Sequence, residues 1–285
     1  MEWIQNLNQA IKYIDEHLTE EIDYDKIAQI AGCSTYHFQK MFVYMAEIPL
    51  SEYIRRRKMT LAAVELQTTK EKIIDIALKY GYSSPTAFNR AFQSIHEVAP
   101  STVRNEGVCV KSFSPLKFKI TIRGVEEMNY RLETKETFRI AGVSMPLSKN
   151  IEENFAVIPQ KWQKISTDGT LEKIVTLMNT EPMGVLGVSV CSTKEQWKYF
   201  IAVATTSNNT EFEERIVPKA TWAIFSGSGT GASIQELEKK IITEWLPTSG
   251  YEYDNDIAVD VEVYLNADPE NAQYEVWIPV VKVGN

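Results

Sequence analysis

Two sets of polar side chains with the chemistry to contact a nucleic acid occur within the first hundred residues. The first set is Tyr36, Gln39 and Lys40, and the second is Thr86, Asn89 and Arg90. Amide, hydroxyl and cationic groups hydrogen-bond base edges or phosphates when a helix lies in a major groove. A solvated helix face has the same composition, so either set alone would favour the ordinary surface interpretation.

The two sets lie in segments that repeat each other, IAQIAGCSTYHFQKMFVYMAEIP from Ile27 and IALKYGYSSPTAFNRAFQSIHEVAP from Ile76. In both, a glycine suited to positive φ is followed by a serine that can cap the next helix and by a Phe–x–x–x–Phe pair that can anchor it. These residues are Gly32, Ser34, Phe38 and Phe42, then Gly81, Ser83 or Ser84, Phe88 and Phe92. The repetition predicts two helix-turn-helix units whose polar sets face outward, because a solvated face has no reason to recur with the same turn chemistry.

The segment between the repeats predicts one long helix, Leu50 to Gln67, without internal Gly or Pro. Such a helix spans about 27 Å, close to the spacing of about 34 Å between successive major grooves on one DNA face. It could therefore hold both reading helices in one chain. The run Arg55–Lys58 is interpreted as a phosphate-contacting patch with Arg55 among the DNA contacts, the alternative being a solvated basic run.

The first hundred residues resemble the AraC/XylS family of bacterial transcription regulators. IAQIAGCSTYHFQKMF, EYIRRRKMTLAAVEL, IIDIALKYGYSSPTAFNRAF and the closing APSTVR match in order over about residues 5–106. The resemblance implies a helical domain with reading helices in two successive major grooves and carries base contacts to both polar sets. The family usually has Gly after each reading helix, where Glu47 and Glu97 stand here, and an aromatic residue where Val103 stands.

In the second half, the helical pattern gives way to short runs of β-branched and aromatic residues. Its order predicts two strand–helix–strand–strand units, over 137–145, 151–166, 184–191 and 198–205, then 216–226, 232–246, 257–265 and 273–283. Two such units can enclose a small-molecule site. Glu262 and Glu275 interrupt apolar strands, where each is either a solvated side chain or a partly buried carboxylate that attracts a cation beside aromatic rings.

Residues of about 130–283, with PKATWAIFSGSGTGASIQELEKKI and EVWIPV, look like a GyrI-like effector-binding domain. The arrangement of an AraC-type domain followed by this one resembles the Rob type of regulator. The resemblance implies a bulky, often cationic or amphipathic ligand. It carries ligand contacts to Glu275, Trp222, Tyr264 and Trp162.

The expected organisation is multidomain: an all-α DNA-binding domain over 1–107, a linker over 108–129 in which Lys111–Ile122 could form a strand, and an α+β domain over 130–285. A net charge of −8 argues against a DNA binder, but residues 26–104 carry eleven basic and six acidic side chains, a local net of +5. Three scattered cysteines, no signal peptide and no long apolar run favour a cytoplasmic protein.

No nucleophile triad or metal-ligand spacing occurs, and the three histidines fall in the first half, so we expect no cofactor, no metal and no catalysis. The predicted partners are double-stranded DNA, a small-molecule effector and RNA polymerase, with no membrane. Two alternatives for the second half stay open: an enzyme that hydrolyses its ligand, with a glutamate as general base, and a protein-interaction module.

Overall fold

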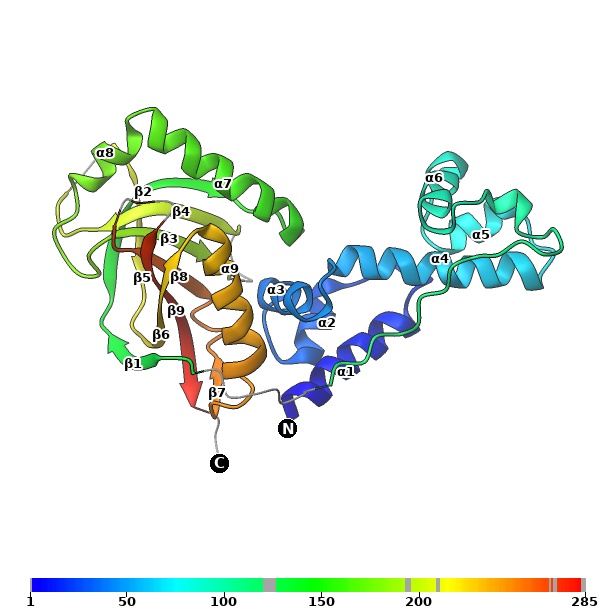
Figure 1. The fold of residues 1–285 in the computed structure, drawn as a ribbon, viewed down its shortest axis with the longest axis horizontal. Coiled ribbons are helices and arrows are strands. Elements are labelled where there is room, and N and C mark those ends of the chain that lie inside the picture. The colour runs from blue at the N-terminus through cyan, green and yellow to red at the C-terminus, as the bar shows by residue number, and fades with distance from the viewer. Residues whose placement is uncertain are drawn as a thin grey trace. The chain divides into compact units, whose positions relative to one another are not determined.

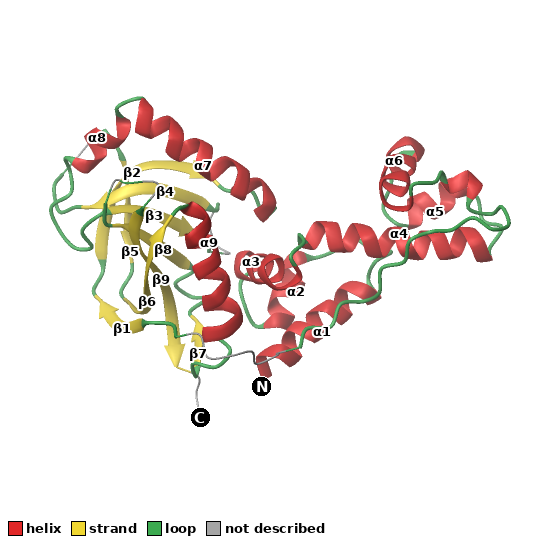
Figure 2. Ribbon diagram, in the orientation of Figure 1, coloured by secondary structure: helices red, strands yellow, loops and turns green. Residues whose placement is uncertain are grey.

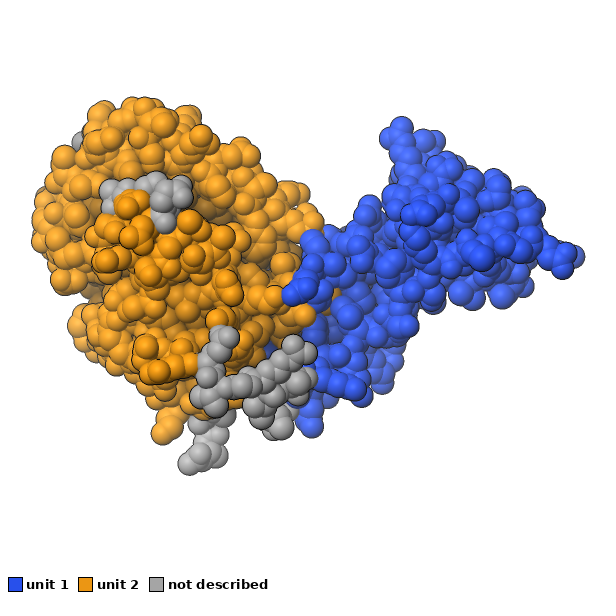
Figure 3. Space-filling view, in the orientation of Figure 1, with its two compact units in different colours: residues 1–35, 46–121 blue, residues 36–45, 122–285 orange. Residues whose placement is uncertain are grey.

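The computed structural model describes residues 2–119, 127–192, 196–208, 211–266, 268 and 271–282. The chain forms two compact units, coloured separately in Figure 3. Unit 1 comprises Met1–Thr35 and Ala46–Thr121, and unit 2 comprises Tyr36–Met45 and Ile122–Asn285. The middle of the first predicted reading helix is therefore part of the strand-rich unit. Residues 120–126 of the predicted linker, and Val283 at the end of the last predicted strand, lie outside the described residues.

Helices form unit 1, as the sequence predicts (Figure 1). They are α1 (Glu2–Glu16), α2 (Tyr24–Ala31), α4 (Leu50–Thr68), α5 (Ile73–Lys79), α6 (Pro85–His96) and the short 3-10 helix η1 (Pro100–Thr102). The carboxylate of Asp23 caps α2 by accepting hydrogen bonds from the amides of Asp25 and Lys26. Gly32 ends that helix at a φ of 76°, the left-handed conformation predicted for the first turn.

The second helix-turn-helix has the predicted construction. Gly81 has a φ of 86°, and Ser84 caps α6 by accepting from the amide of Ala87 at 3.4 Å. Phe88 and Phe92 are fully buried on the inner face of α6. They pack with α4 and α5 side chains that include Met59, Leu66, Ile76 and Tyr80. This core fixes the outer face of α6 as the face that carries Thr86 and Arg90.

The glutamates that replace the family's glycines keep a glycine-like backbone. Glu47 has a φ of 57° and Glu97 a φ of 63°, both in the left-handed region. A side chain there costs energy that glycine avoids. The turns after α3 (Thr35–Ala46) and α6 therefore have a backbone conformation that glycine adopts readily, although the residue in each is glutamate.

The segment after η1 is not the strand that its alternation suggested. Its described residues, 111–119, form no strand, and their backbone amides bond to side chains of the helices instead. Phe113 donates to Thr60 Oγ1 at 3.1 Å, Leu116 to the Tyr53 hydroxyl at 3.2 Å, and Phe118 to Asn8 Oδ1 at 2.8 Å. Polar side chains of α1 and α4 thus satisfy the donors that a neighbouring strand would otherwise accept.

Unit 2 is built on a curved antiparallel sheet with helices alongside it (Figure 2). Its strands are β1 (Tyr130–Lys135), β2 (Phe138–Pro146), β3 (Val185–Val190), β4 (Lys198–Ala204), β5 (Glu213–Val217), β6 (Ala220–Gly229), β7 (Tyr251–Tyr253), β8 (Val259–Tyr264) and β9 (Ala272–Lys282). The order is β1-β6-β9-β8-β3-β4-β2-β5, and β7 pairs with β9. Its helices are α7 (Ile151–Thr167), α8 (Thr170–Val175), α9 (Gly231–Lys240) and the π-helical turn Ile241–Trp245.

The two predicted strand–helix–strand–strand units are present, as β2-α7-β3-β4 and β6-α9-β8-β9. One predicted strand, 216–226, is wrong: the chain forms β5 and β6 there, separated by Pro218 and Lys219. Proline cannot donate to a strand ladder, which ends β5 before the chain turns. β1 and β7, and the helix α8, were not predicted.

The sheet has two chemically different faces. One face carries a closed apolar cluster that includes Leu186, Val188, Val261, Trp222 and Trp277. The other face packs against the helices: α7 contributes Ile151 and Ile165, and α9 contributes Ile234. A row of paired residues crosses this helical face, Ile201 on β4, Gly187 on β3, Glu262 on β8 and Val276 on β9. Glu262 therefore points to the helical side.

Candidate DNA-reading helices and effector site

The second predicted reading helix, α6, presents its polar set to the outside. Thr86 and Arg90 are exposed and Asn89 is half-buried. The buried Phe88 and Phe92 occupy the opposite face. This arrangement leaves a hydroxyl, an amide and a guanidinium available on one side of a capped helix, as a major-groove reader needs.

The first predicted reading helix differs, and the expectation of an outward polar face is not met in this structure. The residues Tyr36, Gln39 and Lys40 are only 7%, 3% and 5% exposed. In α3, residues 35–42 are all buried, so both faces of the helix are covered. Burial on every side means that this part of the helix is enclosed by protein, its polar side chains included. Most of these enclosed side chains belong to residues 36–45, the part of α3 that lies in unit 2.

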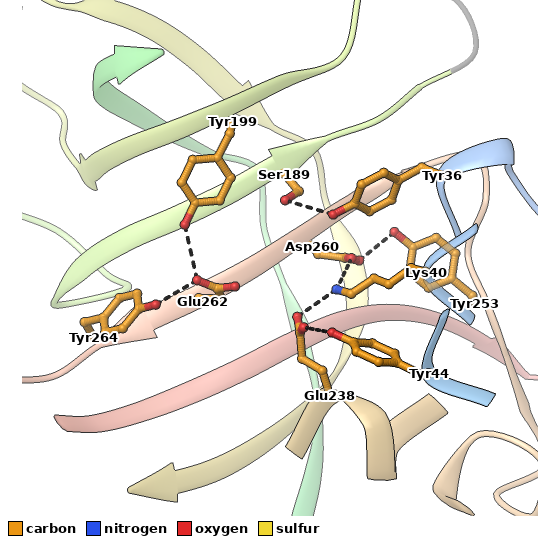
Figure 4. A network of polar contacts seen from close by, with 10 residues as sticks. All are labelled: Tyr36, Lys40, Tyr44, Ser189, Tyr199, Glu238, Tyr253, Asp260, Glu262 and Tyr264. Atoms are coloured by element: carbon orange, nitrogen blue, oxygen red, sulfur yellow. Dashed lines mark hydrogen bonds and ion pairs between the residues drawn. The ribbon is translucent and has the colours of Figure 1, made fainter. Parts of the chain in front are cut away.

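Lys40 lies at the centre of a polar network that joins α3, α9 and β8 (Figure 4). Its ammonium is 2.7 Å from Oε1 of Glu238 and 3.3 Å from Oδ2 of Asp260. The second oxygen of each carboxylate accepts a hydrogen bond from a tyrosine. The hydroxyl of Tyr44 donates to Oε2 of Glu238 at 2.6 Å, and that of Tyr253 to Oδ1 of Asp260 at 2.7 Å. Every charged atom of this buried pair set has a partner, as burial of charge requires.

Further contacts within unit 2 hold residues 36–45 to the rest of that unit. The Tyr36 hydroxyl lies 3.5 Å from Ser189 Oγ on β3, and the Gln39 amide donates to the carbonyl oxygen of Lys149 at 2.8 Å. The His37 ring stacks on Tyr253 with 4.3 Å between centroids. The Tyr44 ring is 6.5 Å from Phe155 of α7, so residues 36–45 touch both α7 and α9.

The pKa values of this network follow from burial and charge. Burial alone would lower the pKa of Lys40, but the carboxylates of Glu238 and Asp260 outweigh it and raise the pKa well above its usual range. Burial, and then the neighbouring ammonium of Lys40, lower the pKa of His37 to about 3. Lys40 is therefore the cation of the network, and His37 is neutral near pH 7.

Glu262 lies next to this network in a setting of aromatic rings. Its Oε2 accepts from the hydroxyls of Tyr264 at 2.9 Å and Tyr199 at 3.2 Å. The indole of Trp162 on α7 donates to the Tyr199 hydroxyl at 3.0 Å and lies 5.0 Å from the Tyr264 ring. Burial first, and then the charge of Glu238, raise the pKa of Glu262 to about 7. This carboxyl group has no cation within ion-pair distance among the described residues.

We call Glu238, Asp260 and Glu262 the carboxylate cluster. Among the described residues of this region, these three carboxyl groups face one ammonium, that of Lys40. A carboxyl group flanked by aromatic rings attracts organic cations, because ring faces and carboxylate both favour positive charge. The cluster therefore has the chemistry of a cation site.

Gly187 makes room for the aromatic part of this site. A Cβ at that position would overlap the hydroxyl oxygen of Tyr199 and lie 2.8 Å from Oε2 of Glu262. The backbone of β3 can approach both groups because no side chain intervenes. Gly187 is thus a positioning residue for Tyr199 and Glu262.

The four predicted ligand contacts do not form one site. Trp162 and Tyr264 meet beside Glu262, but Trp222 is wholly buried in the apolar cluster of the opposite face. Glu275 also belongs to that face, in the cross-strand row with Val263, and Arg131 binds it with two hydrogen bonds of 2.8 and 3.0 Å. Strand alternation gives the physical reason: Glu275 is an odd number of residues from Val276 and Tyr274, which face the helices.

The basic run of α4 is mostly engaged within the protein. Arg57 is buried against Asp15, 2.6 Å from its carboxylate, and Arg56 lies over the Phe113 ring at 5.2 Å. Arg55 is exposed and paired with Glu52 at 2.5 Å. Of the run, Arg55 has the exposure that a phosphate contact requires.

Sequence reasoning missed Tyr44, Glu238, Tyr253 and Asp260. A signal for two of them was present. Tyr36, Lys40 and Tyr44 recur every four residues and so share one helix face, and Asp260 and Glu262 share one strand face within an apolar run. Nothing in the sequence pairs these two faces with each other, since they lie about two hundred residues apart.

No described helix has the length and hydrophobicity to cross a membrane. No group of three or more His, Cys, Asp and Glu side chains is placed to hold a metal ion among the residues that were described.

The chain matches two protein families. Residues 128–281 match the family described as a GyrI-like small molecule binding domain, and residues 27–106 match a helix-turn-helix domain of AraC type. The regulatory protein SoxS of Salmonella typhimurium is 40% identical over 101 residues, which are 35% of this chain and 94% of that protein. The transcriptional activator AarP of Providencia stuartii is 40% identical over 98 residues, or 34% of this chain and 73% of that protein.

Among solved structures, a bacterial transcription regulation protein from Staphylococcus aureus matches with a TM-score of 0.48 and 18% identity, covering 54% of this chain and 99% of that one. The family matches together cover both halves of the chain in the order expected from the sequence. The chain belongs to the AraC-type DNA-binding transcription regulators that carry a C-terminal GyrI-like small-molecule-binding domain.

Proposed function

We propose that this regulator reads a DNA site spanning two adjacent major grooves and that its GyrI-like domain senses an organic cation. The observation that carries the DNA part is α6, a capped helix with Thr86, Asn89 and Arg90 on its outer side. The observation that carries the effector part is Glu262 among Trp162, Tyr199 and Tyr264. No catalytic role is proposed, and the relatives named above are regulators.

The DNA part is tested by selecting duplexes from a random library with the full chain and then footprinting the selected site. We expect protection of two adjacent grooves. Arg90→Ala, at an exposed position, should weaken binding to the selected duplex by about 10-fold or more, as the loss of a good base contact does. Lys12→Ala, which removes an exposed positive charge from α1 of the same unit, is the control for a general charge effect. Equal losses in the two variants would refute the reading role of α6.

The effector part is tested with benzyltrimethylammonium, which carries an aromatic ring and a fixed positive charge. Calorimetry should detect binding to the full chain, and benzyl alcohol, the neutral probe, should bind more weakly because it lacks the charge. Glu262→Gln should weaken binding of the cation by about 10-fold or more and leave the alcohol unaffected.

The same titration compares the two candidate carboxylates. Glu275→Gln should leave the affinity for benzyltrimethylammonium close to that of the wild type, because Arg131 already neutralises this carboxylate. A loss with Glu275→Gln and none with Glu262→Gln would return the ligand site to the opposite face of the sheet.

We also propose RNA polymerase as a protein partner. Val64, Ile74 and Leu78 of α4 and α5 are large apolar side chains exposed in unit 1, with Leu78 at 57%. Leu78→Glu should reduce transcription from a promoter that carries the selected site while the footprint persists. Unchanged transcription would remove this surface from consideration.

A further inference from the structure

We propose that residues 36–45 occupy the effector site of unit 2 as an internal ligand, with Lys40 in the place of the cation, so that an organic cation releases this helix for DNA binding. The proposal rests on the function proposed above and adds its regulation. It assigns the sign of the response: the effector increases DNA affinity.

The two halves of the repeat differ in the exposure of their polar side chains. Thr86, Asn89 and Arg90 correspond to Tyr36, Gln39 and Lys40 by their equal spacing from the Phe pairs. Thr86 and Arg90 are exposed, whereas the three side chains of α3 are buried and bonded to unit 2. A side chain bonded in this way cannot also contact a base edge. The state seen here and a state that reads DNA through α3 therefore exclude each other.

The charge of the carboxylate cluster requires a cation in the site. Departure of Lys40 would leave Glu238 and Asp260 buried without a cation, and an uncompensated buried charge is strongly unfavourable. A cation from solution can restore the balance. When residues 36–45 are released, the carboxylate cluster favours a positively charged ligand. When no such ligand is present, Lys40 supplies the cation.

Little space is left in the site while residues 36–45 occupy it. The cavity that remains beside Lys40, bounded by His37, Tyr253 and Ile278 among others, has a volume of about 10 Å³. That is no more than one water molecule needs. Room for an effector next to Glu238 and Asp260 arises when residues 36–45 leave. The effector therefore cannot bind while residues 36–45 are enclosed. In the same way, α3 cannot read DNA while these residues are enclosed.

Because effector and DNA both bind the released state, each must increase the affinity for the other by the same factor. A ligand that binds one state alone shifts the equilibrium toward it. The coupling is positive, opposite to that of a ligand that competes with DNA.

The test weakens the enclosed state from the side of unit 2, leaving α3 unchanged. In the full chain, the double variant Glu238→Gln with Asp260→Asn removes both carboxylates that hold Lys40. We expect it to bind the selected duplex at least 10-fold more tightly than the wild type. The control is Asp168→Asn with Glu172→Gln, two exposed side chains of unit 2 that give the same charge change and should have little effect.

A second readout follows release of the helix without DNA. Cys191 is buried in the same cluster as Tyr36 and Trp197, and burial raises the pKa of its thiol well above the usual range. In a chain with Cys33→Ala and Cys109→Ser, Cys191 should react slowly with a thiol reagent. The reaction should accelerate at least 10-fold in the double variant and in the presence of benzyltrimethylammonium.

Because the double variant could unfold the protein, a variant with a smaller change is tested beside it. Tyr44→Phe removes one hydrogen bond to Glu238 and keeps the ring, and it should shift DNA affinity and Cys191 reactivity in the same direction by a smaller factor. DNA affinity unchanged or lowered in both variants, with wild-type binding of DNA and cation intact, would overturn the inference alone. Failure of the wild type to bind any duplex would instead refute the proposed function, and the inference with it.

Discussion

The ammonium of Lys40 lies 2.7 Å from the carboxylate of Glu238, a residue 198 positions further along the chain. One partner belongs to a helix with the sequence of a DNA reader, and the other to the helix that flanks the sheet of the small-molecule-binding domain. Both side chains are buried, and Tyr44 and Asp260 complete their hydrogen bonding. This pair ties the burial of Lys40, in the first predicted reading helix, to the carboxylates of Glu238 and Asp260.

The Tyr44 hydroxyl should contribute measurably to holding residues 36–45 in unit 2. Hydrogen bonds to charged groups contribute about 1.5–3 kcal/mol, so Tyr44→Phe should lower amide exchange protection across these residues by about 10- to 100-fold. Hydrogen exchange with mass spectrometry would measure it. Tyr13→Phe on α1 is the matched change in unit 1, and comparable losses in 36–45 from both variants would contradict the assignment.

Ionisation of Glu262 should make unit 2 less stable as the pH rises. Its pKa is raised to about 7 in the folded state, so the folded chain holds a proton that the unfolded chain releases near 4.5. The stabilisation is therefore complete at low pH and is lost as the pH rises through about 7. Glu262→Gln should remove this dependence, on the order of 1–3 kcal/mol between about pH 4.5 and pH 8.

Urea unfolding of the wild type and of Glu262→Gln at several pH values within that range would measure the dependence. Carboxylates elsewhere contribute to both proteins and cancel in the comparison. Parallel curves for the two proteins would show that Glu262 titrates normally.

A side chain at position 187 should disrupt the aromatic part of the proposed effector site. Gly187→Ala would force the Tyr199 hydroxyl and the Glu262 carboxylate apart. Overpacking of this kind costs about 1–3 kcal/mol. We expect a lower midpoint of thermal unfolding and at least 10-fold weaker binding of benzyltrimethylammonium by calorimetry.

Gly231→Ala is the matched control, because a Cβ there meets no atom within 4 Å. It should leave cation binding unchanged. Wild-type affinity in Gly187→Ala would show that Tyr199 and Glu262 take no part in the site.

Replacing Glu97, which follows α6 in the left-handed backbone conformation, with glycine should make unit 1 more stable. Glu97 has a φ of 63°, where a side chain costs about 1–2 kcal/mol and glycine recovers part of this after its own entropy cost. Its ion pair with Lys111 is exposed and contributes little. Glu97→Gly should therefore stabilise unit 1 by about 0.5–1 kcal/mol.

Glu97→Ala separates the two effects, since it removes the carboxylate and keeps the strained backbone. Urea unfolding followed by circular dichroism should place Glu97→Gly above the wild type and Glu97→Ala at or below it. The reverse order would mean that the ion pair outweighs the backbone strain.

The amino-acid sequence by itself determined the helix-turn-helix repeat and the order of elements in the sheet domain. These features depend on local rules: Gly32 and Gly81 at left-handed turns, Ser84 as a cap, and Phe88 and Phe92 four residues apart. The resemblance to a GyrI-like domain, and no local rule, placed Trp162 and Tyr264 among the candidate ligand contacts, and the structure brings these two together.

Tertiary structure alone decided which glutamate lies beside Trp162 and Tyr264. It also decided that the first predicted reading helix is buried. Glu262 and Glu275 have similar apolar neighbours in sequence, and only the pairing of β8 with β9 puts one on the helical face and the other against Arg131. Likewise, Lys40 and Arg90 hold equivalent places in the repeat, yet one is enclosed and the other exposed. Burial of a charge depends on partners brought from distant parts of the chain, and here those partners are Glu238 and Asp260.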